Sequence, residues 1–410
     1  MPRPMAHDPY ASLRSGEYRA FLGAMGATFV ATQVQSAVLG WQVYALTHDP
    51  LSLGLVGLAE ALPFLGLTLV GGWVADRVDR RALSLAGLAA VGASGAALLL
   101  LSLGAPRSAA PFYLAQALAG VGRAFFRPAS SALGTELVDR EHYHNAATWR
   151  SSVLQTAMVV GPAVGGGLIA LGGPRLAYGV VVALTVVGFA SLAAIAPRPR
   201  GAPAAGRLLA QPVLLGAMTL DLFAVLFGGA NALLPVFARD VLHVDEVGFG
   251  FLRAAPAIGA VAMSLALARF GHFRRAGRTL LWSVAFFGLT WVAFALSRWY
   301  ALSLALLVVG GALDSVSVVL RTTLVQLWTP AEKMGRVAAV NGFFIGSSNE
   351  LGAFESGVAA RLLGTVPSVV FGGAMTLATV ALVAWRAPTL RRLDRLAPIE
   401  VAPASPAPAK

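Results

Sequence analysis

Long apolar runs separated by short polar turns set the pattern of this sequence. Each run holds about 20 residues or more, which is the length that an α-helix needs to cross the hydrocarbon core of a bilayer. The pattern therefore predicts an all-α integral membrane protein with twelve transmembrane helices. The predicted spans are 20–46, 51–75, 82–104, 109–134, 143–171, 175–196, 212–239, 246–269, 279–297, 300–328, 334–363 and 367–386.

One interior stretch, residues 197–211, has no run long enough to span a bilayer and is dense in Pro, Gly and Arg. We interpret it as a cytoplasmic linker between two six-helix halves, residues 20–196 and 212–386. Residues 1–19 then form a cytoplasmic N-terminal segment, and residues 387–410 form a cytoplasmic tail.

A sparse internal repeat supports this division. Shifting the chain by 191 positions aligns residues of the two halves: Gly120 with Gly311, Glu141 with Glu332, Gly161 with Gly352 and Gly166 with Gly357. The same shift sets Arg123 opposite Asp314. Two repeated halves of the same topology are typical of transporters that rock around a site near the middle of the membrane.

Composition agrees with the membrane interpretation. Hydrophobic residues make up 57% of the chain and charged residues only 12%, which leaves too little polar surface to cover a soluble particle of 410 residues. The chain has no cysteine, which excludes a disulfide framework, a thiolate metal site and a cysteine nucleophile. We interpret the net charge of +12 as membrane topology rather than as nucleic-acid binding.

The distribution of basic residues predicts the orientation. Most Lys and Arg residues lie on the side that holds both termini and the linker, and this side is therefore expected to be cytoplasmic. Only five basic residues lie in turns on the other side: Arg107, Arg175, Arg239, Arg298 and Arg361.

Nine charged residues fall inside predicted spans. Each costs on the order of 3 kcal/mol near the bilayer centre, so each should face a partner or a water-filled cavity. They are the candidates for function: Arg123, Arg127, Arg253, Arg321, Glu60, Asp221, Asp314, Glu350 and Glu355.

A charged turn between the second and third spans carries a family motif. Residues 72–81, GWVADRVDRR, resemble the G-x-x-x-D-R-x-G-R-R signature of the major facilitator superfamily. The sequence departs from it at Asp79, where the family has Gly. We expect a left-handed turn there, which Asp tolerates better than most residues.

The resemblance implies that this turn is a gate. In the family the acid caps a helix of the opposite half, so Asp76 is expected to meet the start of span eleven near Lys333 and Arg336. The arginines of the turn are expected to pair with nearby groups and so to close the cytoplasmic side. The predicted gate residues are Gly72, Asp76, Arg77, Arg80 and Arg81, together with Glu60.

Span five resembles a second motif. Residues 161–166, GPAVGG, are similar to the G-P-x-x-G-G motif of the antiporter branch, with the key positions Gly161, Pro162, Gly165 and Gly166. The alternative is plain helix packing, because Gly and Pro are frequent in membrane helices of every class.

Finer similarity points to one group within the superfamily. Residues 125–129, 220–229 and 335–357 resemble the subgroup of bacterial exporters that includes the enterobactin exporter and general drug exporters. This implies a multi-pass protein of the bacterial cytoplasmic (inner) membrane that exports a siderophore or an amphipathic drug and contributes to efflux and multidrug resistance.

Export in exchange for protons needs a group that is either protonated or occupied by cargo, but not both at once. Three intramembrane carboxylates fit: Asp314, Asp221 and Glu350. The resemblance favours Asp221 and Asp314, because spans one, four, seven and ten line the cavity in the family.

The intramembrane arginines leave two alternatives open. Arg123 and Arg127 either bind an anionic group of the cargo, such as a catecholate or carboxylate, or pair with a nearby acid that neutralises a buried charge. Glu60 is either a gate residue or a partner for Arg253.

Neutral polar residues in spans one and seven suit an amphipathic cargo. They are Gln33, Gln35, Trp41, Gln42 and Asn231. The alternative is that these side chains form hydrogen bonds across helix contacts.

Other function classes find little support. No G-x-x-x-x-G-K-[ST] pattern is present, and His142 and His144 are spaced too closely to share a helix face as metal ligands. We therefore expect a monomeric secondary transporter, not an enzyme, with no metal, cofactor or nucleic-acid partner. Its partners are a small molecule, protons and the lipid bilayer. The alternatives are a proton-coupled uptake symporter and a membrane sensor that transports nothing.

Overall fold

The computed structural model describes residues 8–104, 106–197, 226, 230–270, 275–328 and 334–386, which form helices and turns without a β-strand. In chain order the elements are η1 (Ala11–Arg14), α1 (Gly16–Thr47), α2 (Pro50–Ala75), α3 (Arg80–Leu103), α4 (Ala110–Glu136), η2 (Arg140–His142), α5 (Tyr143–Ala193), η3 (Ala230–Leu233), α7 (Leu234–Val236), the π-helical turn η4 (Phe237–Val241), α8 (Glu246–Phe270), α9 (Ala276–Leu296), α10 (Tyr300–Trp328), α11 (Met334–Leu363) and α12 (Thr365–Arg386).

The predicted all-helical membrane fold is confirmed. Within the described residues, eight helices are long and apolar enough to cross a bilayer. One of them, α5, contains two predicted spans, because its helical geometry breaks at Gly172 and Gly173, where φ is −154° and +68°. The positive φ suits a residue without a side chain. Outside those eight, α4 and α11 are 27 and 30 residues long and carry intramembrane charges.

The full count of twelve stays a prediction. Most of the expected span 212–239 lies outside the described residues, as do nearly all of the linker and the whole of the tail.

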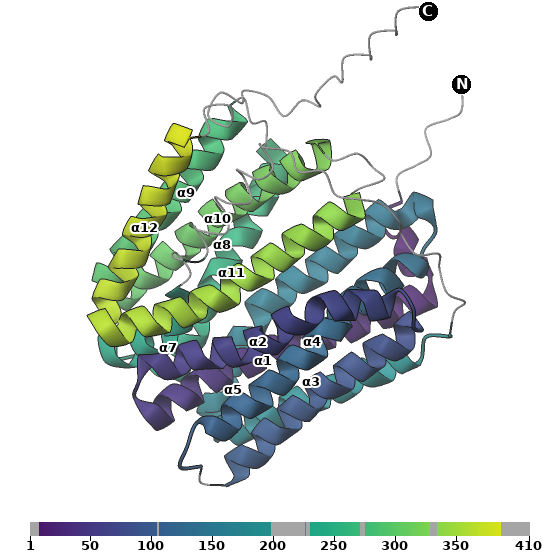
Figure 1. Ribbon diagram of the computed structural model, residues 1–410, viewed down its shortest axis with the longest axis horizontal. Helices are drawn as coiled ribbons and strands as arrows, with labels where there is room; N and C mark the ends of the chain where they lie inside the picture. The colour runs from purple at the N-terminus through teal and green to yellow at the C-terminus, as the bar shows by residue number, and fades with distance from the viewer. Residues whose placement is uncertain are drawn as a thin grey trace, which may run out of the picture.

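We call residues 8–197 the first half and residues 230–386 the second half. In the first half, α1 packs along α5, and α4 lies between α2 and α3 (Figure 1). In the second half, α10 packs against α8 and α9, and α12 packs against α9. Adjacent halves of packed helices are what a parallel repeat produces.

The halves meet near one end of the bundle. We call the end that holds the α1–α2 turn the Asp49 end, and the opposite end, which holds the α2–α3 turn, the Asp76 end. The halves meet toward the Asp49 end, where α2 packs on α11 and α5 packs on α8. A Cβ on Gly166 would lie 2.4 Å from the Glu246 carbonyl oxygen, so only glycine permits this approach. Close helix contact through small residues is usual in membranes.

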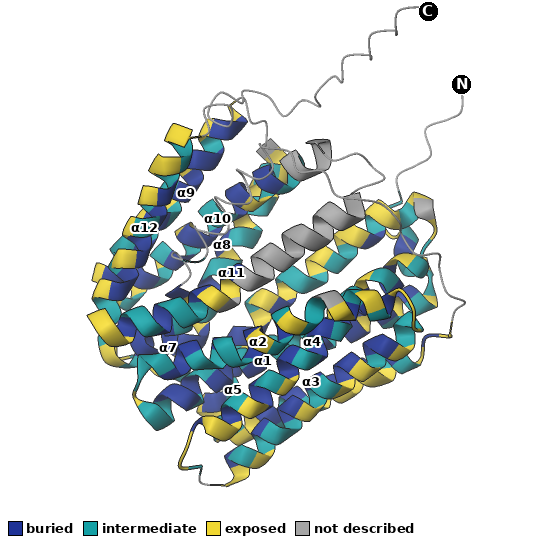
Figure 2. Ribbon diagram, in the orientation of Figure 1, coloured by how far each residue is buried: buried dark blue, intermediate teal, exposed yellow. Residues whose placement is uncertain are grey.

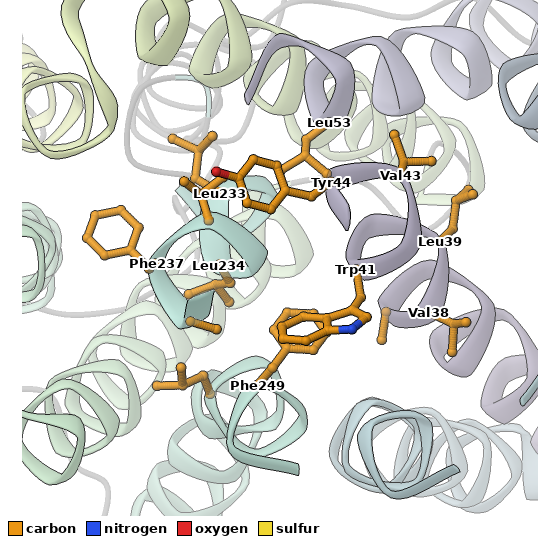
Figure 3. Packing of buried hydrophobic residues seen from close by; sticks show 14 of the residues in the cluster. Val38, Leu39, Trp41, Val43, Tyr44, Leu53, Leu233, Leu234, Phe237 and Phe249 are labelled. Carbon is orange, nitrogen blue, oxygen red and sulfur yellow. The ribbon is translucent and has the colours of Figure 1, made fainter. Parts of the chain in front are cut away.

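Charged and aromatic side chains add to the same contact. The Arg361 guanidinium lies 3.2 Å from the Asp49 carboxylate, across the two halves. Trp41 of α1 stacks on Phe249 of α8, with 5.1 Å between ring centroids (Figure 3). All the cross-half contacts recorded between described side chains involve residues in the part of the bundle toward the Asp49 end.

The outward surface is apolar, as a lipid environment requires. Leu265, Trp282 and Trp385 have more than 60% of their surface exposed, and exposed positions run along the outer helices (Figure 2). Large apolar side chains at this exposure would be an aggregation surface in water, but in a bilayer they face hydrocarbon.

The α5–α8 contact yields a prediction. Gly166→Ala should disfavour closure of the Asp49 end, because the added methyl group meets a backbone oxygen and overpacking costs about 1–3 kcal/mol. Leu171→Cys and Val247→Cys in this cysteine-free chain would carry spin labels, and we expect the label-to-label distance distribution to shift to longer values.

Gly167→Ala is the matched control, since a Cβ on Gly167 has no heavy atom within 4 Å. Equal distance distributions in the two alanine variants would contradict the proposed contact.

Candidate functional site

Intramembrane charges of the first half come together in one buried pair. Glu60 of α2 forms an ion pair with Arg123 of α4 and accepts a hydrogen bond from the Gln116 amide, also of α4. Glu60 is only 6% exposed. Because a lone carboxylate would be expensive at this depth, the pair makes the charge tolerable.

Neutral polar side chains extend the pair across the half. Gln116 Oε1 accepts from Gln35 Nε2 at 3.3 Å, and the same nitrogen lies 3.2 Å from Ser94 Oγ. The residues Arg123, Glu60, Gln116, Gln35 and Ser94 form what we call the polar network. Because its members come from α1, α2, α3 and α4, it ties four helices together inside the membrane.

A glycine brings the two charged helices together. A Cβ on Gly120 would lie 2.3 Å from the Glu60 carbonyl oxygen, so the backbones of α4 and α2 touch about one turn before Arg123. The prediction that Glu60 pairs with Arg253 is wrong, because its partner is Arg123, and its role as a gate residue stays a prediction. Arg253 instead donates to Ser36 Oγ at 2.7 Å, from α8 to α1.

The second arginine of α4 lies on the same face. Arg127 is exposed, and its guanidinium carbon lies 5.4 Å from the centroid of the Phe64 ring of α2. Glu60 and Phe64 are four residues apart, as are Arg123 and Arg127, so two cations face one side of α2. The Arg123 side chain is 24% exposed, compared with 8% for Glu60.

Two predicted lining residues form hydrogen bonds across helix contacts. Besides the Gln35 bonds, Gln42 Nε2 donates to Ser102 Oγ of α3 at 3.0 Å. Gln33 packs on span five, because a Cβ on Gly161 would lie 2.4 Å from the Gln33 Cβ. These contacts match the alternative stated for such residues, and contact with cargo stays a prediction.

The other two predicted lining residues lie near the contact between the halves. Trp41 is 4% exposed, and the Arg239 guanidinium carbon lies 4.1 Å from its ring centroid. Next to them, the Tyr44 hydroxyl donates to Asp240, which links α1 to η4. Asn231 is exposed in η3.

The span-five motif lies between α1 and α8. Gly165 faces Val34 and Ala37 of α1, whereas Gly166 and the Pro162 carbonyl face Gly250 of α8. The motif thus takes part in the contact between halves, and its role in antiport stays a prediction.

The predicted proton-coupling carboxylates are less fully described. Asp314 is half-buried in α10. Asp221 lies outside the described residues, and Glu350 lies on α11 with its side chain outside them. No contact recorded among described residues joins Asp314 to Arg123, so its role stays a prediction.

At the Asp76 end, Asp76 is exposed at the C-terminus of α2, and its carboxylate has no ion-pair partner within the described part of the chain. The predicted partner of Asp76 is the start of span eleven near Lys333 and Arg336. Lys333 and the Arg336 side chain fall outside the described part. Arg77 folds back over Trp73, with 4.0 Å from its guanidinium carbon to the ring centroid. Gly72 has open space around its Cα, since a Cβ there would meet no heavy atom within 4 Å.

The prediction of a left-handed turn at Asp79 is wrong. Its φ is −55°, and its carboxylate instead accepts a hydrogen bond from the Ala82 backbone N–H at 2.6 Å. Asp79 is therefore the N-cap of α3, a position that strongly favours Asp.

The two arginines that follow tie the Asp76 end of the first half together. Arg80 pairs with Glu136 at the end of α4, at 2.5 Å. Arg81 donates to the Ala193 carbonyl oxygen at the end of α5, at 2.6 Å. Both brace the first half where α3 begins.

Sequence reasoning missed two parts of the site. Gln116 lies seven residues before Arg123, which places both on one helix face, and this spacing could have indicated it. The Tyr44–Asp240 bond had no such signal, because it joins elements far apart in the sequence.

Comparisons with known proteins identify relatives of the whole chain. A family model described as Transmembrane secretion effector matches residues 7–407. The enterobactin exporter EntS of Shigella boydii is 29% identical over 389 residues, which cover 89% of this chain and 92% of the exporter.

Solved structures share the fold. A POT family transporter in complex with a thioalcohol-conjugated peptide superposes with a TM-score of 0.75 and 10% identity, over 91% of this chain and 96% of that one. A bacterial homologue of the human lysosomal transporter Spinster, in an inward-facing and occupied conformation, gives 0.73 and 16%, over 94% and 99%.

The buried pair yields a prediction for stability. Arg123→Ala should destabilise the protein by about 3 kcal/mol, because it leaves the Glu60 carboxylate buried without a cation. Thermal unfolding in detergent would report this as a lower melting temperature. Glu60→Gln combined with Arg123→Met, which removes both charges, should recover most of the loss.

The control is Arg107→Ala, which removes an exposed arginine from the α3–α4 turn. If Arg123→Ala and Arg107→Ala melted at the same temperature, the pair would contribute nothing to stability.

Proposed function

Because the chain belongs to the family of transmembrane secretion effectors, within the major facilitator superfamily, we propose that it exports a small organic molecule. The protein is a multi-pass transporter of the bacterial inner membrane. We further propose that it works by alternating access, with the cargo held between its two halves.

The single observation that carries the proposed cargo site is the Glu60–Arg123 pair. The Arg123 guanidinium lies inside a membrane span, and its side chain is 24% exposed. A planar guanidinium in this position can bind a planar anionic group. We propose that the cargo is a siderophore or an amphipathic drug with a catecholate or carboxylate. Similarity to an enterobactin exporter supports the siderophore.

Export is proposed to be driven by proton antiport. Asp314 of α10 is the first candidate for the coupling carboxylate, because it is half-buried inside a span and lies opposite Arg123 in the internal repeat. Asp221 and Glu350 are the others. The span-five motif at the contact between halves supports the antiport direction.

We propose that the two ends of the bundle open in turn. The contacts at the Asp49 end hold it shut in this structure. Closing of the other end would bring Asp76 to the start of α11, where a carboxylate is favoured by the helix dipole. Arg80 and Arg81 hold the first half rigid while it moves.

Reconstituted proteoliposomes with an imposed pH gradient test this function. We expect an anionic catechol cargo to move in the direction opposite to proton flow. Protons should be released into the compartment that the cargo leaves. Movement in the same direction as protons would favour uptake by symport, and no flux for a broad ligand panel would favour a sensor.

The coupling site has its own prediction. Asp314→Asn should abolish accumulation of cargo driven by a pH gradient, because an amide side chain cannot take up or release a proton. Exchange of cargo between equal concentrations on the two sides should remain. Both rates are measured in the same proteoliposomes.

Asp245→Asn is the control, since the amide oxygen can keep the hydrogen bond to the Gly248 backbone N–H. Gradient-driven transport by Asp314→Asn at the wild-type rate would reject Asp314 as the coupling group.

A further inference from the structure

Arg123 already has an anionic partner within the protein. Its guanidinium contacts Glu60, whose carboxylate is more deeply buried than the arginine that it neutralises. Any anionic cargo that binds Arg123 must therefore displace, or share the guanidinium with, a carboxylate of the protein itself.

The pair lies between helices of the first half, and some of these helices also contact the second half. Gln116, Gly120 and Arg123 form one stripe of α4, which contacts α2 through Glu60 and α1 through Gln35. Both α1 and α2 contact the second half, through Trp41 and Gly54 for example. The stripe therefore faces the two helices, α1 and α2, that connect the first half to the second.

Among the described residues, few other charged side chains lie on the elements packed around Glu60. On α4 the charged groups of this region are Arg123 and Arg127, and the described charged side chains of α11 are Glu355 and Arg361. Arg361 pairs with Asp49. From α1 and α3 the groups that face the pair are the neutral Gln35 and Ser94, and η3 has no titratable residue. Among these, Arg123 is in contact with Glu60.

We propose that the Glu60 carboxylate competes with the anionic group of the cargo for Arg123, and that Glu60 releases Arg123 when it takes up a proton. This rests on the proposed function, in which Arg123 binds the cargo, and it makes that site selective for anions.

Displacement has a proton balance. Cargo bound to Arg123 leaves Glu60 as a second negative charge in a buried place, which is costly unless it takes up a proton. The Gln116 amide can donate to the carbonyl oxygen of a protonated Glu60 as it does to the carboxylate. Anionic cargo and one proton on Glu60 therefore bind together, and the affinity for an anion rises as the pH falls.

This sign separates Glu60 from the coupling group. Exchange of cargo for a proton requires that the two exclude each other, whereas at Glu60 they bind together. Glu60 therefore sets affinity and selectivity, and the coupling carboxylate of the proposed antiport lies elsewhere, with Asp314 as the first candidate.

Direct binding to the purified full chain tests the proposal without any transport. The probes are 2,3-dihydroxybenzoate, a catechol with a carboxylate, and 2,3-dihydroxybenzamide, its uncharged analogue, titrated by calorimetry between pH 5.5 and 8. We expect wild type to bind the benzoate about tenfold more tightly at the acidic end, and the benzamide equally at both ends.

Glu60→Gln should bind the benzoate about tenfold more tightly than wild type at pH 8 and lose the pH dependence, with benzamide affinity unchanged. Asp8→Asn, an acid-to-amide change where Asp8 pairs with Arg14, should behave as wild type. The same pH series on Asp314→Asn, which lacks the proposed coupling group of opposite sign, tests the proposal even if Glu60→Gln fails to fold.

Weaker or pH-independent benzoate binding by Asp314→Asn at acidic pH would overturn the proposal. So would unchanged benzoate affinity in Glu60→Gln, or no benzoate binding by either protein. If binding follows the expected pattern but proteoliposomes show no flux, the competitor role stands and the proposed export function fails.

Discussion

The first half of this transporter depends on one constraint, which is that a charge inside a bilayer must have a partner. Glu60 and Arg123 satisfy it for each other, and the neighbouring elements are arranged to make the contact possible. Gly120 lets the backbones of α2 and α4 touch, and Gln116 satisfies Glu60 further. The same constraint makes the pair suitable for function, because any ligand that takes one partner changes the stability of the other.

Motion between the halves follows from how they meet. Inside the first half, α4 is held by close backbone contacts with α2 and by a polar network across four helices. Between the halves the described contacts are small-residue helix crossings, a shared cluster of buried apolar side chains, one exposed ion pair and a few aromatic or hydroxyl contacts. The exposed ion pair adds little to this boundary, because surface ion pairs are worth little. We expect the halves to move as units, with each half keeping its own close helix contacts.

Sequence reasoning predicted what depends on local pattern. The helical spans follow from the length of the apolar runs, and the break near Gly172 follows from two glycines before Pro174. It named the wrong partner for Glu60, Arg253 instead of Arg123, because both arginines lie inside spans and the close approach of α2 and α4 at Gly120 depends on packing. At Asp79 the family pattern suggested a turn, whereas the local chemistry of a helix start decided the geometry.

The most direct test of the account is a structure of the transporter with an anionic catechol bound. The account predicts that the Arg123 guanidinium contacts the anionic group of the ligand, and that Glu60 has left Arg123 while keeping its contact with Gln116. An intact Glu60–Arg123 pair, with the ligand bound elsewhere, would contradict it.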